Sequence, residues 1–321
     1  MRGVLIRAAI GAGIIIVGFA IAVVVLNQTV YTPVSFVRGY VAALARHDPA
    51  AALEMAGPVP TSSSRDELLG SRIMSDIESY TVEETGEHDG VHTVVVEYRA
   101  DGRNGRTTFS VSRAGGVLGI FPTWQFAESP LAQIELTVQH ARDFTANGVL
   151  LVAPAAGVQT TYLAFTPGVI AFGHESELLE AATQTVVLSS PRTDRIVTVD
   201  AEANAAFLEL VDSKVRDYLD DCASQPRLFP AGCPFGQQLT DRYVGDPAWT
   251  ITAYPAISLA PTSEEGVWTV PATGGVAHLD VQVESIADGS IAPLSTDVPF
   301  TIGFVVTFIG AADVAVTPQL G

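Results

Sequence analysis

Residues 8–26, with the sequence AAIGAGIIIVGFAIAVVVL, decide how this chain is organised. No side chain in this run carries a charge, an amide or a hydroxyl, and Arg2 and Arg7 stand just before it. At a helical rise of about 1.5 Å per residue, the run covers most of the hydrocarbon core of a bilayer. We therefore predict a cytoplasmic segment over residues 1–7, one transmembrane helix over residues 8–26 and a soluble body after them.

The two arginines predict the orientation of that helix. Short cytoplasmic flanks carry Arg and Lys, so we expect the N-terminus in the cytoplasm and the body outside it. The helix would be the signal anchor of a single-pass cell-membrane protein. A cleaved secretory signal is the alternative, because Ala20-Ile21-Ala22 has the small-residue spacing of a cleavage site. The apolar run continues to Leu26, which favours the uncleaved anchor, and the absence of a nearby cysteine excludes a lipoprotein anchor.

The charge of the body limits its partners. The chain has a net charge of −18, and the part after Arg7 carries 15 basic and 35 acidic residues, a net charge of −20. Such a body repels phosphate backbones and anionic lipid headgroups. We therefore exclude nucleic acid as a partner. The expected partners are the membrane, through the N-terminal helix, and other proteins of the cell envelope.

Cys222 and Cys233 are the only cysteines, and they enclose ten residues. In an oxidising compartment this spacing predicts one short disulfide-closed loop. A redox pair and half of a metal site are the competing interpretations. Redox pairs favour a gap of two residues beside a βαβ pattern, which is missing at this place.

The fold class we predict is α+β, with three domains after the transmembrane helix. The first covers residues 31–125, where helical periodicity gives way to strand periodicity. Helices are expected to start at Pro33 and at Pro49, and Ser64 with Glu67 has the capping-box spacing of a third helix that ends near residue 76. The helices should pack on an antiparallel sheet.

Four strands of that sheet are expected after the helices. Asp89-Gly90 and Asn104-Gly105 are hairpin-turn dipeptides that separate them. In a hairpin with its turn at Asp89-Gly90, His92 lies opposite Glu87. The expected strands are residues 79–87, 92–99, 107–112 and 117–125.

The remaining chain predicts two further domains. Residues 127–200 contain short, evenly spaced strands typical of a small β-sandwich, with one short helix near residues 176–182. Residues 201–321 begin with an amphipathic helix that ends at Cys222, continue through the disulfide loop and resume as strands. The sandwich strands are expected at 134–138, 149–152, 160–165, 169–172, 185–188 and 196–199, and the last strands at 249–259, 266–270, 276–285, 298–308 and 314–317.

The helix at Val34, the segment Arg46-His47-Asp48-Pro49-Ala50-Ala51-Ala52-Leu53 and the later strands together resemble the nuclear transport factor two-like superfamily. That resemblance implies a cone-like domain of helices cupped by a curved antiparallel sheet. Residues 201–321 repeat the order of helix and strands. The layout of one helix followed by small outer domains is similar to the teicoplanin-resistance-associated proteins of bacterial envelopes, although their zinc ribbon is missing. The superfamily includes enzymes, carriers and scaffolds, so it supplies no function.

No motif predicts a catalytic, cofactor-binding or metal-binding residue, and the disulfide cysteines are the only site residues we assign. Glu87, His88 and His92 are expected near one another at one hairpin tip, and zinc needs three or four such ligands. We favour the alternative explanation, a polar hairpin tip in solvent. His140, His174 and His278 have no carboxylate at a ligand spacing. Nucleophile elbows, phosphate loops and dinucleotide fingerprints are absent from the sequence.

These observations favour a non-catalytic interaction or scaffolding protein at the outer face of a bacterial membrane. A carrier of a small ligand is the first alternative, because a cone fold can enclose a cavity. An envelope enzyme is the second, and it requires a histidine and a carboxylate that face one pocket. The aromatic residues that would line a cone cavity, or fill a packed core instead, are Phe36, Tyr40, Tyr98, Phe109, Phe121 and Trp124.

Overall fold

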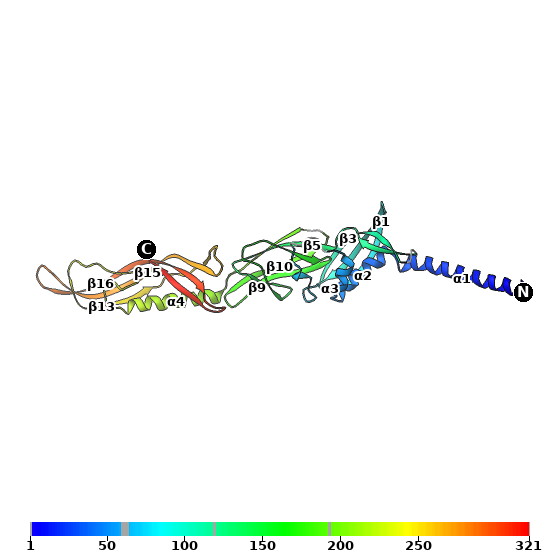
Figure 1. Ribbon diagram of the computed structural model, residues 1–321. Helices are drawn as coiled ribbons and strands as arrows, with labels where there is room; N and C mark the ends of the chain where they lie inside the picture. The colour runs from blue at the N-terminus through cyan, green and yellow to red at the C-terminus, as the bar shows by residue number, and fades with distance from the viewer. Residues whose placement is uncertain (1, 59–63, 118–119, 192–193, 321) are drawn as a thin grey trace.

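A computed structural model describes residues 2–58, 64–117, 120–191 and 194–320. Its described part is α+β, with helices and mostly antiparallel sheets. Figure 1 shows an elongated molecule in which helix α1 projects from one end and three structural units follow in chain order. The α-helices are α1 (Arg2–Thr29), α2 (Pro33–Ala45), α3 (Pro49–Ala56) and α4 (Ala205–Ala223).

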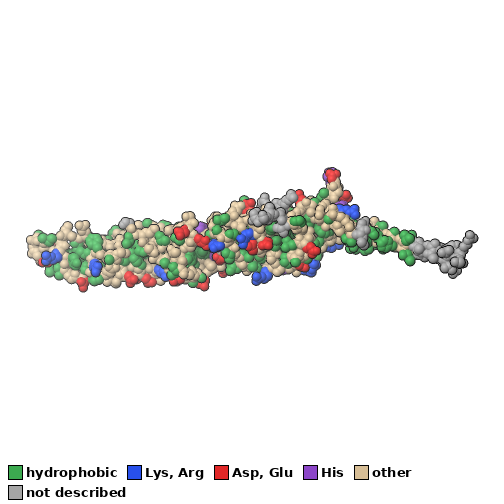
Figure 2. Space-filling model, in the orientation of Figure 1, with side chains coloured by type: hydrophobic (Ala, Val, Ile, Leu, Met, Phe, Trp, Pro, Cys, Tyr) green, Lys and Arg blue, Asp and Glu red, His purple; other side chains and the backbone are tan. Residues whose placement is uncertain are grey.

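Helix α1 stands apart from the rest of the molecule (Figure 1). Its large apolar side chains from Ile14 to Val25, except Val23, are more than half exposed, and they contribute to the apolar surface of the projecting helix in Figure 2. By length and hydropathy, no single helix among the described residues qualifies as a membrane span. The segment Ile14–Thr29 and α2 qualify only as a pair, bent by 54°.

The C-terminal end of α1 is fastened to the first unit by hydrogen bonds. Asn27 Nδ2 donates to the backbone oxygen of Ile120 over 3.1 Å, and Trp124 Nε1 donates to the backbone oxygen of Tyr31 over 3.0 Å. The ring of Tyr31 also stacks on Phe121, with 4.6 Å between centroids. The direction of α1 is therefore set by contacts with the sheet of the first unit.

The first unit packs α2 and α3 on a four-stranded antiparallel sheet. Thr32 Oγ1 accepts a hydrogen bond from Ser35 N, and Asp48 Oδ1 accepts one from Ala51 N, so both predicted helix starts are confirmed. Tyr40 of α2 is fully buried against the sheet. The strands follow one another in the order β1 (Ile77–His88), β2 (Val91–Ala100), β3 (Arg103–Val117) and β4 (Phe121–Phe126).

Two sequence predictions fail in this unit. The third helix is reduced to the 3-10 turn η1 (Glu67–Leu69), because the segment pairs with the second unit instead: Arg65 forms a parallel bridge with Tyr162. The turn expected at Asn104-Gly105 lies at Asp101-Gly102, whose φ values are 46° and 71°. Asn104 and Gly105 are part of β3.

The position of Gly105 explains why this glycine stands inside a strand. Gly105 pairs with Tyr98, whose ring covers it, and a Cβ at position 105 would lie 2.3 Å from the ring carbon Cζ. Tyr98 is itself only 5 % exposed, so its ring has little room to move away.

We predict that Gly105→Ala destabilises the protein by about 1–3 kcal/mol, the usual cost of overpacking a well-filled core. The free energy of unfolding is measured by urea denaturation. Gly86→Ala is the matched control, because Gly86 also lies in a strand and a Cβ there meets nothing within 4 Å. Equal stability of the two variants would contradict this interpretation of Gly105.

The second unit consists of two sheets. One has the strand order β12-β10-β9-β6-β7 and the other the order β11-β5-β8, in which β11 runs parallel to β5. The short helix expected at residues 176–182 is wrong: Ser176 Oγ accepts a hydrogen bond from Leu179 N, which closes a turn, and β10 starts at that residue. The strands are β5 (Leu131–Gln139), β6 (Asp143–Ala146), β7 (Val149–Val152), β8 (Thr160–Phe165), β9 (Gly168–Glu175), β10 (Leu179–Leu188), β11 (Asp194–Asp200) and β12 (Glu202–Ala203).

The first and second units share their hydrophobic cores. Leu68 and Ile73, which precede β1, are buried with the core of the second unit. Leu163 and Phe165 of β8 are buried with the core of the first. The hydroxyl of Tyr40 donates to the backbone oxygen of Thr166 over 3.0 Å, and its burial raises the pKa of that phenol. The two units are therefore joined by packing as well as by the chain.

We predict that Tyr40→Phe, which removes only this buried hydroxyl, lowers the free energy of unfolding by about 1 kcal/mol. Thermal or urea denaturation measures the change. Tyr80→Phe in the same unit is the control, because that side chain is only partly buried and has no hydrogen bond among the described residues. A Tyr40→Phe variant as stable as the control would show that the contact with Thr166 adds nothing.

The third unit packs α4 on a sheet with the order β13-β15-β16-β17. Its core is continuous with that of the second unit. Two expected strands are one long strand, β15, whose register shifts between Val270 and Thr273, at Pro271. The strands are β13 (Arg242–Ala253), β14 (Ala260–Pro261), β15 (Val267–Glu284), β16 (Ile291–Phe308) and β17 (Val314–Gln319).

Strand β16 is only partly covered by its outer neighbour. Strand β17 pairs with β16 from Gly303 to Phe308, whereas β15 pairs with it from Ile291 onward. Pro293 and Pro299 both lie in the part of β16 that β17 leaves free.

The predicted disulfide is confirmed. Cys222 at the end of α4 is bonded to Cys233, with 5.7 Å between the Cα atoms. The enclosed loop is held from inside by Gln225, whose Oε1 accepts from Ala231 N over 2.8 Å. Tyr218 on α4 donates its hydroxyl to the backbone oxygen of Gly232 over 2.6 Å. These contacts give the cysteine pair a structural role.

Candidate functional site

A cleft between the second and third units is the candidate site. Strands β5 and β11 are parallel, and Gln139 pairs with Asp200 at their ends. Asp200 is the last residue of β11, and His140 directly follows β5. Parallel strands end at the same edge of a sheet, so side chains that are distant in sequence come together there. The imidazole Nδ1 of His140 lies 3.0 Å from Oδ1 of Asp200. Both residues line the cleft.

The third unit supplies the opposite wall. Trp268 of β15 is 3 % exposed, and its ring contacts the rings of His140 and Phe207 at centroid distances of 5.7 Å and 5.5 Å. Strand β14 pairs with β15 so that Pro261 is opposite Trp268. The cleft has a volume of about 420 Å³, and its apolar side chains are Ala203, Leu208, Ile257, Leu259, Pro261 and Trp268.

The rim of the cleft is acidic. A neighbouring hollow of about 380 Å³ is lined by Glu180 together with Asp200 and Glu202, which it shares with the cleft. Another, of about 420 Å³, is lined by Glu264 and Glu265. Among the described residues, no Lys or Arg lines any of the three hollows. The combination of an apolar wall and a carboxylate rim suits a ligand that is both apolar and cationic.

A second polar cluster lies on the open face of β15 and β16. His278 Nδ1 is 2.6 Å from Oδ1 of Asp297, and its Nε2 is 2.8 Å from Oγ of Ser295. The order Ser, His, Asp is that of hydrolase triads. Asp297 is 67 % exposed, however, and acyl transfer relies on a site that excludes water. The cluster is therefore a solvated cross-strand contact.

The hydrogen bond to Asp297 raises the pKa of His278 above its ordinary value, and the carboxylate of Asp280, 3.6 Å away, acts in the same direction. A histidine with a raised pKa stabilises the folded state at pH values below the unfolded pKa of about 6.5, and this contribution is lost as the pH rises through the folded pKa.

We predict that Asp297→Asn lowers the pKa of His278 toward its ordinary value, as measured by an NMR titration of the imidazole. Asp280→Asn should lower it less, because that carboxylate is farther from the ring and is not its main partner. A pKa that is unchanged in the Asp297→Asn variant would show that the pair is not formed in solution.

The other histidines considered in the sequence analysis make contacts that stabilise the fold. His174 is 4 % exposed, and its two ring nitrogens contact the backbone oxygen of Asp143 and Oγ of Ser176, at 2.8 Å and 3.2 Å. His92 lies opposite Glu87, as expected, but its Nδ1 is 2.7 Å from Glu84 Oε1. Among the described residues, no group of three or more His, Cys, Asp or Glu is arranged to hold a metal ion.

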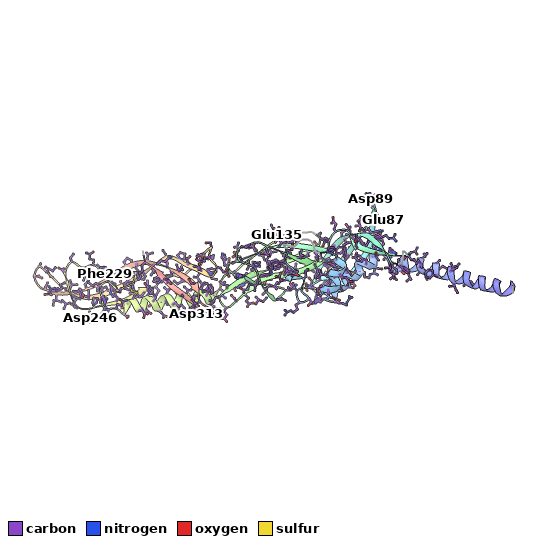
Figure 3. All side chains as sticks on the ribbon, in the orientation of Figure 1. Glu87, Asp89, Glu135, Phe229, Asp246 and Asp313 are labelled. Carbon is purple, nitrogen blue, oxygen red and sulfur yellow. A yellow bond between two sulfur atoms is a disulfide. The ribbon has the colours of Figure 1, made fainter. Side chains whose placement is uncertain are left out.

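The hairpin tip that carries the other predicted ligands points into solvent. Figure 3 shows Glu87 and Asp89 at the end of the projecting β1–β2 hairpin. His88 is almost fully exposed and lies 3.3 Å from the carboxylate of Asp89. The side chains expected together by sequence are near one another in the fold, but they form a solvated tip.

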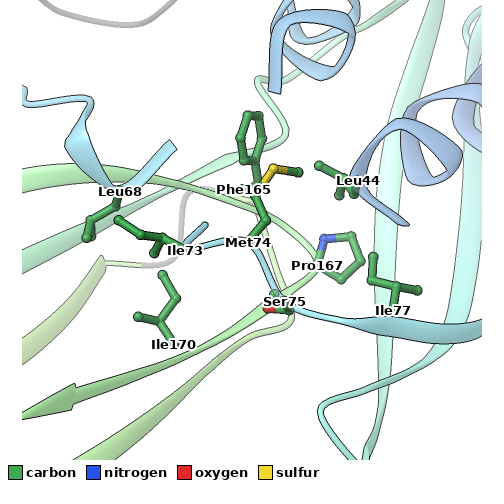
Figure 4. A pocket seen from close by; sticks show the side chains of 10 residues that line it. Leu44, Leu68, Ile73, Met74, Ser75, Ile77, Phe165, Pro167 and Ile170 are labelled. Carbon is green, nitrogen blue, oxygen red and sulfur yellow. The ribbon is translucent and has the colours of Figure 1, made fainter. Parts of the chain in front are cut away.

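The aromatic candidates of the first unit pack on one another. Tyr40 meets Phe109 and Phe126 edge to face, at 5.9 Å and 5.0 Å, and Phe36 lies 5.0 Å from Phe126. The hollow at the junction with the second unit measures only about 20 Å³, roughly the space of one water molecule. Figure 4 shows its lining, in which Leu44, Phe165 and Pro167 converge.

Sequence reasoning missed the cleft. His140 has no carboxylate at a ligand spacing in the sequence, and the parallel pairing that brings Asp200 to it has no local signature. The available signal was weak: a histidine that ends one strand and an aspartate that ends another.

No protein-family model and no curated protein matches this chain. One solved structure, described as an "Ntf2 like protein involved in plasmid conjugation", is similar at 10 % identity. The alignment covers 77 % of this chain and 78 % of that one, with a TM-score of 0.13. This similarity is too low to support an argument about fold or function.

Proposed function

We propose that this protein is a single-pass membrane protein of the bacterial cell envelope whose body lies outside the cytoplasm and acts through contacts with other proteins. The observation that carries the proposal is α1, an apolar helix that projects alone from one end of an acidic body. The exposed side chains of Ile15, Ile16 and Phe19 are 73 %, 67 % and 60 % accessible, which is unfavourable in water and favourable in lipid.

The arrangement of the units supports this role. The three units follow one another away from α1, so the third is held farthest from the membrane end (Figure 1). Shared packing joins each unit to the next, which favours a stiff arm over a flexible chain. We further propose that the first unit is a nuclear transport factor two-like domain, on the order of its helices and antiparallel strands.

The anchor is tested with Val17→Arg, which places a charge in the middle of the apolar run. An arginine at the centre of a transmembrane helix costs about 2.5–3.5 kcal/mol on insertion scales. We expect the unaltered protein to stay in the membrane pellet after alkaline carbonate extraction and the variant to move substantially to the supernatant. Val30→Arg, just beyond the run, is the matched control and should stay in the pellet. Release of the unaltered protein by carbonate would refute the anchor.

The interaction role is tested by crosslinking the full-length protein in intact cells and isolating it. Enrichment of the same envelope proteins in repeated experiments, lost for Val17→Arg, is expected. Recovery of only abundant, nonspecific neighbours would contradict an interaction protein. Added protease should digest the body from the outer side of spheroplasts, because the proposal places it there.

One observation favours a second candidate, an envelope enzyme: His140 and Asp200 form a histidine–carboxylate pair in a cleft, as acid–base catalysis uses. Conversion of a small ester or amide panel by the purified protein, abolished in His140→Ala, would favour this candidate. Equal background rates for both proteins would remove it.

A further inference from the structure

We infer that the cleft between the second and third units binds a basic segment of a partner protein, with an apolar side chain on Trp268 and Leu208 and a Lys or Arg on the acidic rim. This inference rests on the proposed interaction role and names the chemistry of the partner.

The first reason is the unpaired indole of Trp268. The other two tryptophans of the chain donate their Nε1–H to backbone oxygens, Trp124 to Tyr31 over 3.0 Å and Trp249 to Arg227 over 2.7 Å. The side chain of Trp268 as a whole is as deeply buried as that of Trp249, at 3 % and 6 % exposure, yet its Nε1 donates a hydrogen bond to no described residue and is not itself enclosed. An indole N–H normally has a partner, so this donor, on a side chain that lines the cleft, is available to a ligand oxygen.

The second reason is an enclosed histidine nitrogen in the same cleft. His140 Nδ1 is buried and makes no hydrogen bond of good geometry to any described residue, although Asp200 Oδ1 is 3.0 Å away. Two polar groups whose rings are in contact, Trp268 Nε1 and His140 Nδ1, thus lack a hydrogen bond to the described residues. A backbone carbonyl of a peptide would supply the acceptor for the indole, and the carboxylate of Asp200 beside His140 remains on the acidic rim.

The third reason is the charge and polarity of the lining. Leu208 is 37 % exposed, which is unusual for a leucine beside a buried tryptophan, and it faces the same cleft as Ile257 and Leu259. The carboxylates of Asp200 and Glu202 stand at the border with the neighbouring acidic hollow. A peptide supplies carbonyls, apolar side chains and cationic side chains together, whereas a small organic cation supplies only the charge.

The length of the site also fits an extended segment. The three hollows adjoin one another through shared residues: His140 lines two of them, and Asp200 and Glu202 line two. A chain lying along them passes from Glu180 to Glu265 and meets the apolar wall between. Extended peptides bind in this way, with pockets for alternate side chains.

The test uses the full-length protein in a nonionic detergent and a short fluorescein-labelled peptide with one leucine flanked by lysines. Binding is measured by fluorescence anisotropy, against protein-free micelles. We expect saturable binding that the matching peptide with glutamates does not show. Asp200→Asn combined with Glu202→Gln should weaken binding about tenfold, since the rim loses two charges.

Trp268→Phe removes the indole N–H together with the five-membered ring and keeps an aromatic side chain at this position, so it should weaken binding at least about threefold to tenfold, the usual effect of one lost hydrogen bond. The matched charge control is Glu83→Gln combined with Asp246→Asn, both exposed and far from the cleft; Figure 3 places Asp246 near the opposite end of the third unit. This control should bind as the unaltered protein does. Circular dichroism of each variant verifies the fold.

Three outcomes would overturn the inference: no saturable binding, equal weakening by the cleft and control pairs, or full affinity in Trp268→Phe with spermidine bound as tightly as the peptide. The second outcome would mean that only the net charge attracts the peptide, and the third that the site takes small cations. Each leaves the membrane and crosslinking experiments unaffected, so failure here is distinct from failure of the proposed interaction role.

Discussion

The parallel pairing of β11 with β5 determines the rest of the body. Both strands run in the same direction, so the chain leaves the second unit at the edge where β5 ends, and α4 starts from that edge soon after Asp200. The third unit is thereby placed beyond the second in line with the first (Figure 1). The same pairing brings His140 to Asp200 and forms one wall of the cleft. The position of the third unit and the residues of the cleft therefore both follow from the pairing of β11 with β5.

Shared cores maintain this arrangement. A small unit buries a limited fraction of its surface, so additional burial against a neighbour adds stability that the unit alone lacks. The segment with Leu68 and Ile73 crosses from the first unit into the second core, and Phe165 crosses in the opposite direction. The core of the third unit continues that of the second. The cleft lies in such a junction, so its two walls are held in register by packing around them.

Local signals in the sequence predicted local structure. Asp48 caps a helix and Asp89-Gly90 forms a turn because each acts on its immediate neighbours. Asn104-Gly105 has equally good turn chemistry, but Asp101-Gly102 forms the turn and Gly105 accommodates the ring of Tyr98. That choice depends on a tertiary contact. The cleft could not be predicted for the same reason: only the folded structure shows that the indole N–H of Trp268 has no acceptor among the described residues.

The free part of β16 has a consequence for copies of the protein that lie side by side. Exposed strand edges can join into intermolecular sheets, and the membrane anchor that we propose would make such encounters frequent by confining the copies to two dimensions. Pro293 and Pro299 have no N–H, so the edge that β17 leaves open lacks donors at those two positions. The free part of the β15–β16 ribbon is therefore a poor template for pairing with the same ribbon of a neighbouring molecule.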